Sequence, residues 1–179
     1  FNWMRSARRI NRMNADVVVF QWWHPYFAPC YYFLSRLICR SKIMFVCHNV
    51  FPHERFPLDR LLCKMVLGQG DYFVTQSQSD QRDLIRIKPD ARNIVTPHPT
   101  YNAFKMQNLS QEAARTSLGA DVNVPMILFF GFVREYKGLK YLLNAMPIII
   151  KEFPGLQLWV VGDFGDNRSE YKEIITEEG

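Results

Sequence analysis

The stretch Pro125–Lys140, with the sequence PMILFFGFVREYKGLK, shows best how this chain is built. Its apolar run Met126–Phe130 has the length and composition of a buried strand, and the run stops at Gly131. From Gly138 onward, apolar residues recur at helical spacing, which predicts an amphipathic helix. The order strand, glycine turn and helix is typical of an open α/β sheet, where ligands bind at the carboxyl ends of the strands.

Two cations, Arg134 and Lys137, lie in the turn between this strand and this helix. A helix N-terminus offers N–H groups and the positive end of the helix dipole, which suit a phosphate. Charge-assisted hydrogen bonds from the two cations would strengthen that preference. Gly131, Arg134, Lys137 and Gly138 are therefore candidate phosphate-binding residues. The Walker phosphate loop is excluded because no G-x-x-x-x-G-K-[ST] string occurs in the chain.

The composition indicates a globular protein in a reducing compartment. Of the 179 residues, 48% are apolar and 22% are charged, and the aromatic share of 15% argues against disorder. The cysteines form no C-x-x-C pair and lie in apolar segments, so we expect reduced core thiols rather than zinc ligands. They are Cys30, Cys39, Cys47 and Cys63. We therefore expect a cytoplasmic protein.

A basic cluster near the beginning of the chain has two interpretations. The formal net charge is +5, and arginines recur at helical spacing at Arg5, Arg8, Arg9 and Arg12. They form either a solvated helix face or a surface attracted to the anionic inner face of a membrane or to a lipid phosphate. Nucleic acid is not an expected partner, because no known binding module accompanies the charge.

The order of predicted elements indicates two α/β domains, one in residues 1–100 and one in residues 101–179. Four predicted strands begin at Asp16, Lys42, Asp71 and Asn93, with a helix between each consecutive pair, which is typical of a doubly wound parallel sheet. After a crossing segment near Pro97, two further strands are expected at 126–130 and 157–161. The second of these ends at Gly162, which we take as a nucleotide-side turn.

A second informative string is CHNVFPHE, residues 47–54. His48 closes the strand that begins at Lys42, so it should lie at the carboxyl edge of the first sheet. Asn49, His53 and Glu54 follow in the loop and are candidate active-site residues. A single histidine in such a place is more often structural than catalytic.

Taken together, three strings resemble the retaining nucleotide-sugar glycosyltransferases of family 4, which have the GT-B fold. They are CHNVFPHE (47–54), HPTYNAF (98–104) and GFVREYKG (131–138), in this order. In many family members an arginine follows the first glycine of the last string, whereas here the residue is Phe132. The paired glutamates that family members carry later in the second domain have no counterpart in this sequence.

The resemblance implies two incomplete Rossmann-like domains. Residues 1–100 would be the C-terminal part of the acceptor-side domain, and residues 101–179 the N-terminal part of the nucleotide-sugar donor domain. The implied activity is transfer of a hexose from a nucleoside-diphosphate sugar to a glycan, a lipid-linked or a small-molecule acceptor, with retention. The resemblance implies that this reaction needs no metal ion and no other cofactor. His48 would orient a sugar hydroxyl or the acceptor, and Arg134 and Lys137 would hold the diphosphate. The implied pathway is polysaccharide or glycolipid biosynthesis.

Two other functions compete with this one. A non-catalytic α/β protein that binds a nucleotide or polyanion is the alternative, because it could retain the phosphate loop without the chemistry. An NAD-dependent enzyme is disfavoured, because no G-x-G-x-x-G string follows a predicted strand. Because the donor-side glutamates are missing, we expect the 179-residue chain alone to be inactive.

Overall fold

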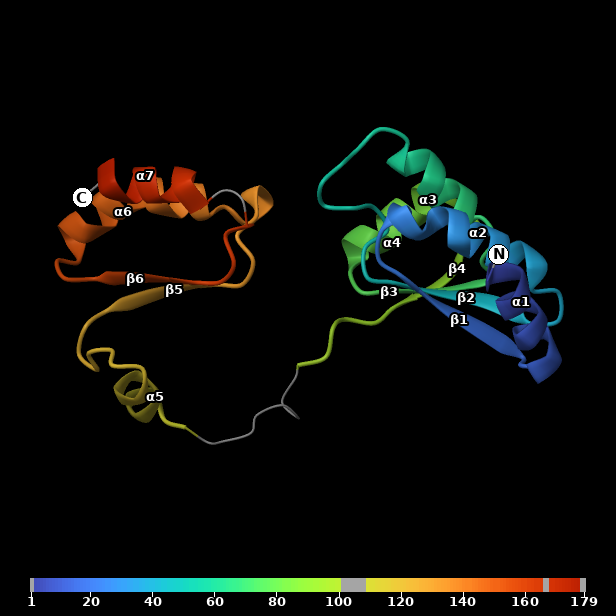
Figure 1. Ribbon diagram of the computed structural model, residues 1–179, viewed down its shortest axis with the longest axis horizontal. Coiled ribbons are helices and arrows are strands. Elements are labelled where there is room, and N and C mark those ends of the chain that lie inside the picture. The colour runs from blue at the N-terminus through green and yellow to red at the C-terminus, as the bar shows by residue number, and fades with distance from the viewer. Residues whose placement is uncertain (1, 101–108, 166–167, 178–179) are drawn as a thin grey trace. The chain divides into compact units, whose positions relative to one another are not determined.

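A computed structural model of the chain describes residues 2–100, 109–165 and 168–177 (Figure 1). The chain divides into two compact units, Phe1–Thr100 and Tyr101–Gly179. Each unit is an α/β arrangement around a parallel sheet, as the sequence predicts. Among the described helices, none has the length and apolar character needed to cross a membrane.

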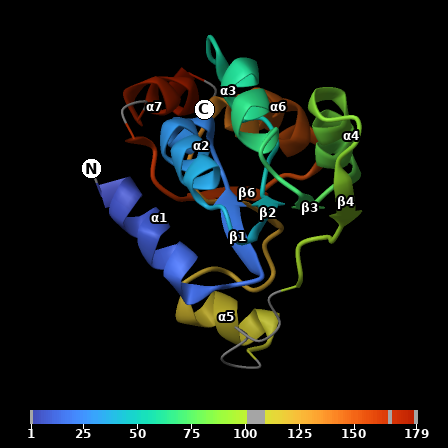
Figure 2. The same ribbon diagram turned by 90° about the vertical axis from the view of Figure 1, so that its right-hand side faces the viewer.

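The first unit is a four-stranded parallel sheet in the order β1-β2-β3-β4, with helices between successive strands (Figure 2). The register pairs Trp22 with Cys47, Cys47 with Thr75, and Thr75 with Val95, so the strands end together. The loops that follow them therefore meet at one edge of the sheet. In chain order the elements are α1 (Asn2–Met13), β1 (Val17–Trp22), η1 (Pro25–Phe27), α2 (Ala28–Leu37), β2 (Lys42–Cys47), α3 (Asp59–Leu67), β3 (Tyr72–Thr75), α4 (Gln78–Ile87) and β4 (Arg92–Val95).

One aromatic ring from each of three strands forms the centre of this unit's core. The rings of Phe20 and Phe45 are 5.4 Å apart, and those of Phe45 and Phe73 are 6.0 Å apart, both pairs stacked. Leu67 from α3 and Leu84 from α4 are fully buried against them. Such burial of large apolar side chains is the main stabilising term of a fold.

The spacing of apolar residues predicts a helix over 31–40, but helix α2 begins three residues earlier, at Ala28. The reason is local: His24 caps a short 3₁₀ turn by accepting a hydrogen bond from the Tyr26 N–H, and Pro25 occupies its first position. This turn continues directly into α2 at Ala28. Proline is well tolerated at the first position of a helix, because its missing N–H has no intrahelical partner there.

The second unit contains two paired parallel strands, β5 and β6, with Met126 opposite Gln157 and Phe130 opposite Val161. Both strands have the predicted bounds. Val133, Leu139 and Leu143 form a small buried cluster with Tyr171. The elements are α5 (Gln111–Ser117), β5 (Met126–Phe130), η3 (Glu135–Lys137), α6 (Leu139–Glu152), β6 (Gln157–Val161) and α7 (Arg168–Glu177).

Candidate functional site

His48 lies immediately after β2, where neighbouring strand ends hold it in place. Its N–H donates a hydrogen bond to the Trp22 carbonyl oxygen at 3.0 Å. On the side chain, Nε2 lies 2.8 Å from the Gln21 Oε1. The Trp23 ring meets the imidazole edge-on, with 5.5 Å between ring centroids. The imidazole is half-buried and fixed from the side of β1, without being part of the apolar core.

A pocket of about 690 Å³ opens beside His48 at the carboxyl ends of β2 and β3. Its wall contains Asn49 and His53, so the structure brings three predicted residues together. Glu54 is exposed and lies outside the pocket wall. The lining residues are His48, Asn49, Phe51, Pro52, His53, Arg55, Gln76, Ser77, Ser79, Asp80, Asp83 and His98. Imidazole, amide, hydroxyl and carboxylate groups make this wall suitable for a ligand rich in hydroxyls.

Asp80 connects two walls of this pocket. Its carboxylate accepts hydrogen bonds from the Val50 N–H at 3.0 Å and from the Ser77 hydroxyl at 2.5 Å. In return, the Asp80 N–H donates to Ser77 Oγ at 3.0 Å, which caps α4. Ser77 is thus the N-cap residue of α4, and its S-x-x-D spacing to Asp80 is that of a capping box. The carboxylate thus joins the loop after β2 to the beginning of α4.

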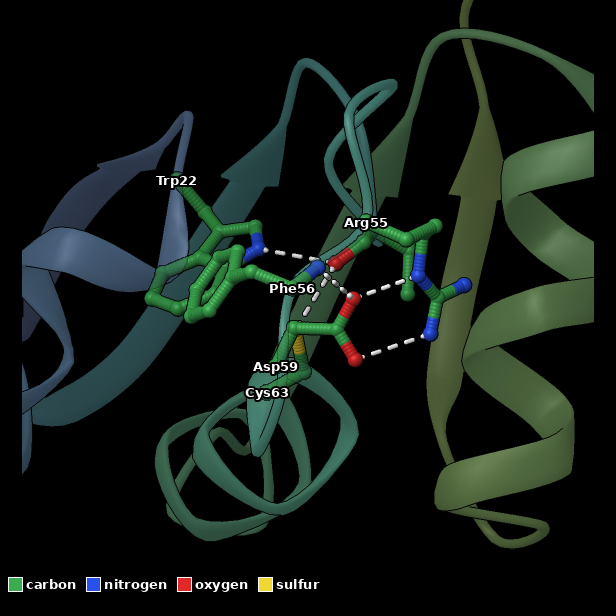
Figure 3. A network of polar contacts seen from close by, with 6 residues as sticks. Trp22, Arg55, Phe56, Asp59 and Cys63 are labelled. Carbon is green, nitrogen blue, oxygen red and sulfur yellow. Dashed lines mark hydrogen bonds and ion pairs between the residues drawn. The ribbon is translucent and has the colours of Figure 1, made fainter.

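The far part of the same loop is held by a charged pair (Figure 3). Arg55 donates from Nη2 to Asp59 Oδ1 at 2.9 Å and from Nε to Asp59 Oδ2, and its guanidinium lies 4.5 Å above the Phe51 ring. The hydrogen bond from Arg55 lowers the pKa of the Asp59 carboxyl below its usual range. Asp59 is therefore ionised at neutral pH and can keep Arg55 in position.

The carbonyl of Val50 anchors the base of this loop to the core. It accepts hydrogen bonds from the Trp22 indole at 3.2 Å and from the Cys63 thiol at 3.3 Å (Figure 3). Burial raises the pKa of Cys63 to about 12, so the thiol is neutral and can donate. The loop that carries His48, Asn49 and His53 is therefore fixed to the core at its base.

In the second unit, the candidate phosphate loop is built on two glycines that touch. Gly131 has φ 109°, a region that disfavours side chains, and its N–H donates to the Val161 carbonyl at 2.9 Å. A Cβ placed on Gly162 would collide with the carbonyl oxygen of Gly131. The turns that follow β5 and β6 are therefore packed backbone against backbone.

The rest of the loop is anchored at Val133 and leads into α6. Val133 is buried, and its N–H donates to the Asp163 carbonyl at 2.8 Å. A 3₁₀ turn, η3, separates Arg134 from α6, and the sequence did not indicate this turn. Gly138, with φ 76°, connects η3 to α6, and the first bond of α6 runs from the Leu142 N–H to its carbonyl.

The two predicted cations remain at the surface of this loop. The Lys137 ammonium lies over Gly131, because a Cβ built on Gly131 would be 3.0 Å from Lys137 Nζ. Arg134 precedes η3 and is exposed, as is Phe132. Within the described ranges, neither cation forms an ion pair with a carboxylate. The positive end of the α6 dipole adds to their field, so the loop is electrostatically suited to an anion.

The described residues contain no group of three or more His, Cys, Asp or Glu side chains that could hold a metal ion. The string HPTYNAF lies only partly within the described residues, and its last four positions fall outside them.

Sequence reasoning missed Gln21, Arg55, Asp80 and His98 as residues of the first unit's pocket and of the His48 surroundings. Two of them carried a signal: Asp80 lies three residues after Ser77, and His98 begins the string HPTYNAF.

No family model matches the chain, but a relative of known name and several solved structures are similar to it. A D-inositol 3-phosphate glycosyltransferase of Segniliparus rotundus is 29% identical over 111 residues, which are 60% of this chain and 24% of that protein. Anabaena Alr3699/HepE, solved in complex with UDP, superposes with a TM-score of 0.72 at 16% identity, over 99% of this chain and 48% of its own.

A structure of OtsA without ligand gives a TM-score of 0.63 at 13% identity, over 98% of this chain and 47% of its own. A trehalose-6-phosphate synthase studied for glycosyl transfer with retention gives 0.63 at 14% identity, with the same coverage. The chain thus spans about half the length of these solved structures. It has the α/β, parallel-sheet fold of the GT-B glycosyltransferases.

Proposed function

We propose that the protein is a retaining glycosyltransferase of family 4. It transfers a hexose from a nucleoside-diphosphate sugar to an acceptor hydroxyl, and the reaction needs no metal ion. The observation that carries the proposal is the loop Gly131–Gly138, where Lys137 lies over a glycine turn next to the α6 N-terminus. The related HepE was solved with UDP, and the Segniliparus relative is named a glycosyltransferase, which supports the same chemistry.

In this mechanism the donor diphosphate binds at the loop. Arg134, Lys137 and the N-terminus of α6 stabilise the negative charge that grows on the diphosphate as the sugar leaves. Because these groups are already in place, the stabilisation needs little reorganisation at the moment of reaction. Each charged hydrogen bond contributes about 1.5–3 kcal/mol. Gly162 packs against the Gly131 carbonyl, so the turn after β6 lies next to the loop.

The acceptor proton needs no strong protein base, because the departing phosphate takes it. His48 orients a sugar or acceptor hydroxyl, and the Gln21 amide fixes the imidazole for that task. Retention is supported by the trehalose-6-phosphate synthase, which is described as transferring with retention and shares this fold.

The acceptor binds in the pocket of the first unit, beside His48, Asn49 and His53. Its lining of amide, hydroxyl and imidazole groups favours a glycan, a lipid-linked sugar or a small polyol. The name of the Segniliparus relative specifies a phosphorylated inositol, which is such a polyol. Residues 1–100 are then the acceptor side and residues 101–179 the donor side. The four cysteines are free thiols, which fits a cytoplasmic enzyme of polysaccharide or glycolipid synthesis.

A transfer assay with the intact protein tests the proposal. Nucleoside-diphosphate sugars are screened for stabilisation by thermal shift, and the best donor is incubated with candidate acceptors in the presence of EDTA. We expect product whose anomeric configuration, read by NMR, equals that of the donor. Inverted product would contradict retention, and loss of product in EDTA would contradict metal independence.

A second candidate function is favoured by one observation. Phe132, exposed at 63%, occupies the place where many family members carry an arginine. A protein that binds a nucleotide or polyanion without catalysis would tolerate that change. Such a protein would bind nucleoside diphosphates at the loop and would release no nucleotide from any donor sugar in the presence of any acceptor.

A further inference from the structure

Helices α1 and α2 lie side by side (Figure 2). Side chains from both helices line an apolar hollow that is open to solvent. The hollow has a volume of about 350 Å³ and is lined by Trp3 and Met4 from α1 and by Phe33 and Leu37 from α2. The Trp3 and Phe33 rings are stacked with their centroids 5.9 Å apart. Phe33 is 52% exposed and Met4 is 49% exposed. No charged or polar side chain lines the hollow.

The hollow is held in shape by hydrogen bonds where α1 meets the end of α2. The Asn11 amide donates to the Leu37 carbonyl at 2.9 Å and accepts from the Cys39 N–H at 3.2 Å. Ala7, on the inner side of α1, is buried. The apolar side of α1 is therefore only partly used in packing, and its first turn remains at the surface.

A stripe of four arginines runs along the outer side of α1. The helix contains no acidic residue, and within the described part of the chain none of the four forms an ion pair. Met4 and Arg8 are one turn apart and share a face of the helix, which places positive charge beside the hollow. The stripe consists of Arg5, Arg8, Arg9 and Arg12.

We propose that this α1–α2 surface docks the protein on an anionic lipid bilayer. Trp3, Met4, Phe33 and Leu37 would enter the headgroup boundary, while the arginine stripe would contact lipid phosphates. An amphipathic helix with arginine on its polar side and tryptophan on the other is the form that lies in a membrane interface. Tryptophan prefers that boundary, because its ring is apolar and its N–H can meet water.

Charge decides between a bilayer and a second copy of this chain as the occupant. A symmetric dimer through α1 would bring two arginine stripes together, and like charges across an interface are unfavourable. An anionic bilayer attracts the same stripe, and each arginine near the membrane surface strengthens binding about fivefold. The inference goes beyond the proposed reaction and does not depend on it, because lipid binding requires no turnover.

Vesicle flotation of the intact protein tests the inference. Vesicles of phosphatidylcholine are compared with vesicles that also contain phosphatidylglycerol, at low and at high salt. We expect binding to the anionic vesicles that weakens with salt. The double variant Arg8→Gln/Arg12→Gln should bind about 25-fold less tightly, at about fivefold per arginine. The double variant Met4→Ser/Phe33→Ser should bind about tenfold less tightly, because it has less apolar area to bury.

Arg82→Gln on α4 and Leu118→Ser after α5 are matched controls for charge and for apolar exposure. Both should bind as the original protein does, and circular dichroism should show all variants folded. Equal binding to neutral and anionic vesicles would overturn the inference, and so would arginine variants that bind unchanged. Size-exclusion chromatography that shows a dimer lost in the Met4→Ser/Phe33→Ser variant, without vesicle binding by the original protein, would assign the surface to self-association.

Discussion

Replacement of Gly162 by alanine should displace the candidate phosphate loop, Gly131–Gly138, which packs against Gly162. Gly162 does not need a positive φ, so an alanine fits its backbone and the cost is steric. The added Cβ would collide with the Gly131 carbonyl, and backbone has no flexible end that could move aside. Overpacking of this kind costs about 1–3 kcal/mol. The two turns must therefore separate, and the Gly131 N–H bond to the Val161 carbonyl should weaken with them.

Hydrogen exchange read by mass spectrometry measures this effect locally. A local destabilisation of about 2 kcal/mol corresponds to roughly 30-fold lower protection. We expect that loss in peptides covering 126–133 and 157–163, with no change in peptides from residues 2–100. Gly155→Ala is the control: a Cβ there meets nothing within 4 Å, but φ is 85°, so only backbone strain of about 1–2 kcal/mol is added, away from the loop. Unchanged protection of the loop in Gly162→Ala would refute the close packing of the two turns.

Three further predictions follow from the first unit and from the chain as a whole. His48→Ala should lower the kcat of sugar transfer by the intact protein about 100-fold, while the melting temperature stays within a few degrees. In the double variant with Gln21→Leu, kcat should be no lower than in His48→Ala alone. A fully active or unfolded His48→Ala protein would contradict this. The pKa of Asp59 is lowered by Arg55, so its contribution to stability is present above the unfolded pKa of about 3.9 and is lost as the pH falls through the folded value. The melting temperatures of the original protein and Asp59→Asn should therefore converge in acid, and a constant difference at all pH values would reject the pairing. The 179-residue chain alone should transfer no sugar, and measurable product from it would disprove that expectation.

Strands and turns could be predicted where the signal is local. Met126–Phe130 and 157–161 are apolar runs that end at glycines, and both strands have the expected bounds. His48 was expected as the last residue of the strand that begins at Lys42, and it lies directly after β2, because the apolar run ends at Cys47. The α2 start was missed, because the cap at His24 depends on a side-chain geometry that the spacing of apolar residues does not reveal.

The surroundings of the candidate site were largely beyond sequence reasoning. Gln21 and His48 are 27 residues apart, and Val50 and Asp80 are 30 apart, so their contacts exist only once neighbouring strands align. The contact of Gly131 with Gly162 likewise depends on the pairing of β5 with β6. The roles of His48, Arg134 and Lys137 remain predictions, because they require a bound donor.

Calorimetric titration of the intact protein with nucleoside diphosphates tests the central claim most directly. UDP, GDP, ADP and TDP are compared at moderate salt, and the tightest is titrated into Lys137→Ala and Arg134→Ala. Lys151→Ala, at the other end of α6, is the matched control. The account predicts about tenfold or greater loss of affinity for Lys137→Ala, a smaller loss for Arg134→Ala and none for Lys151→Ala. Equal diphosphate affinity in all four proteins would contradict the assignment of Gly131–Gly138 as the donor phosphate loop.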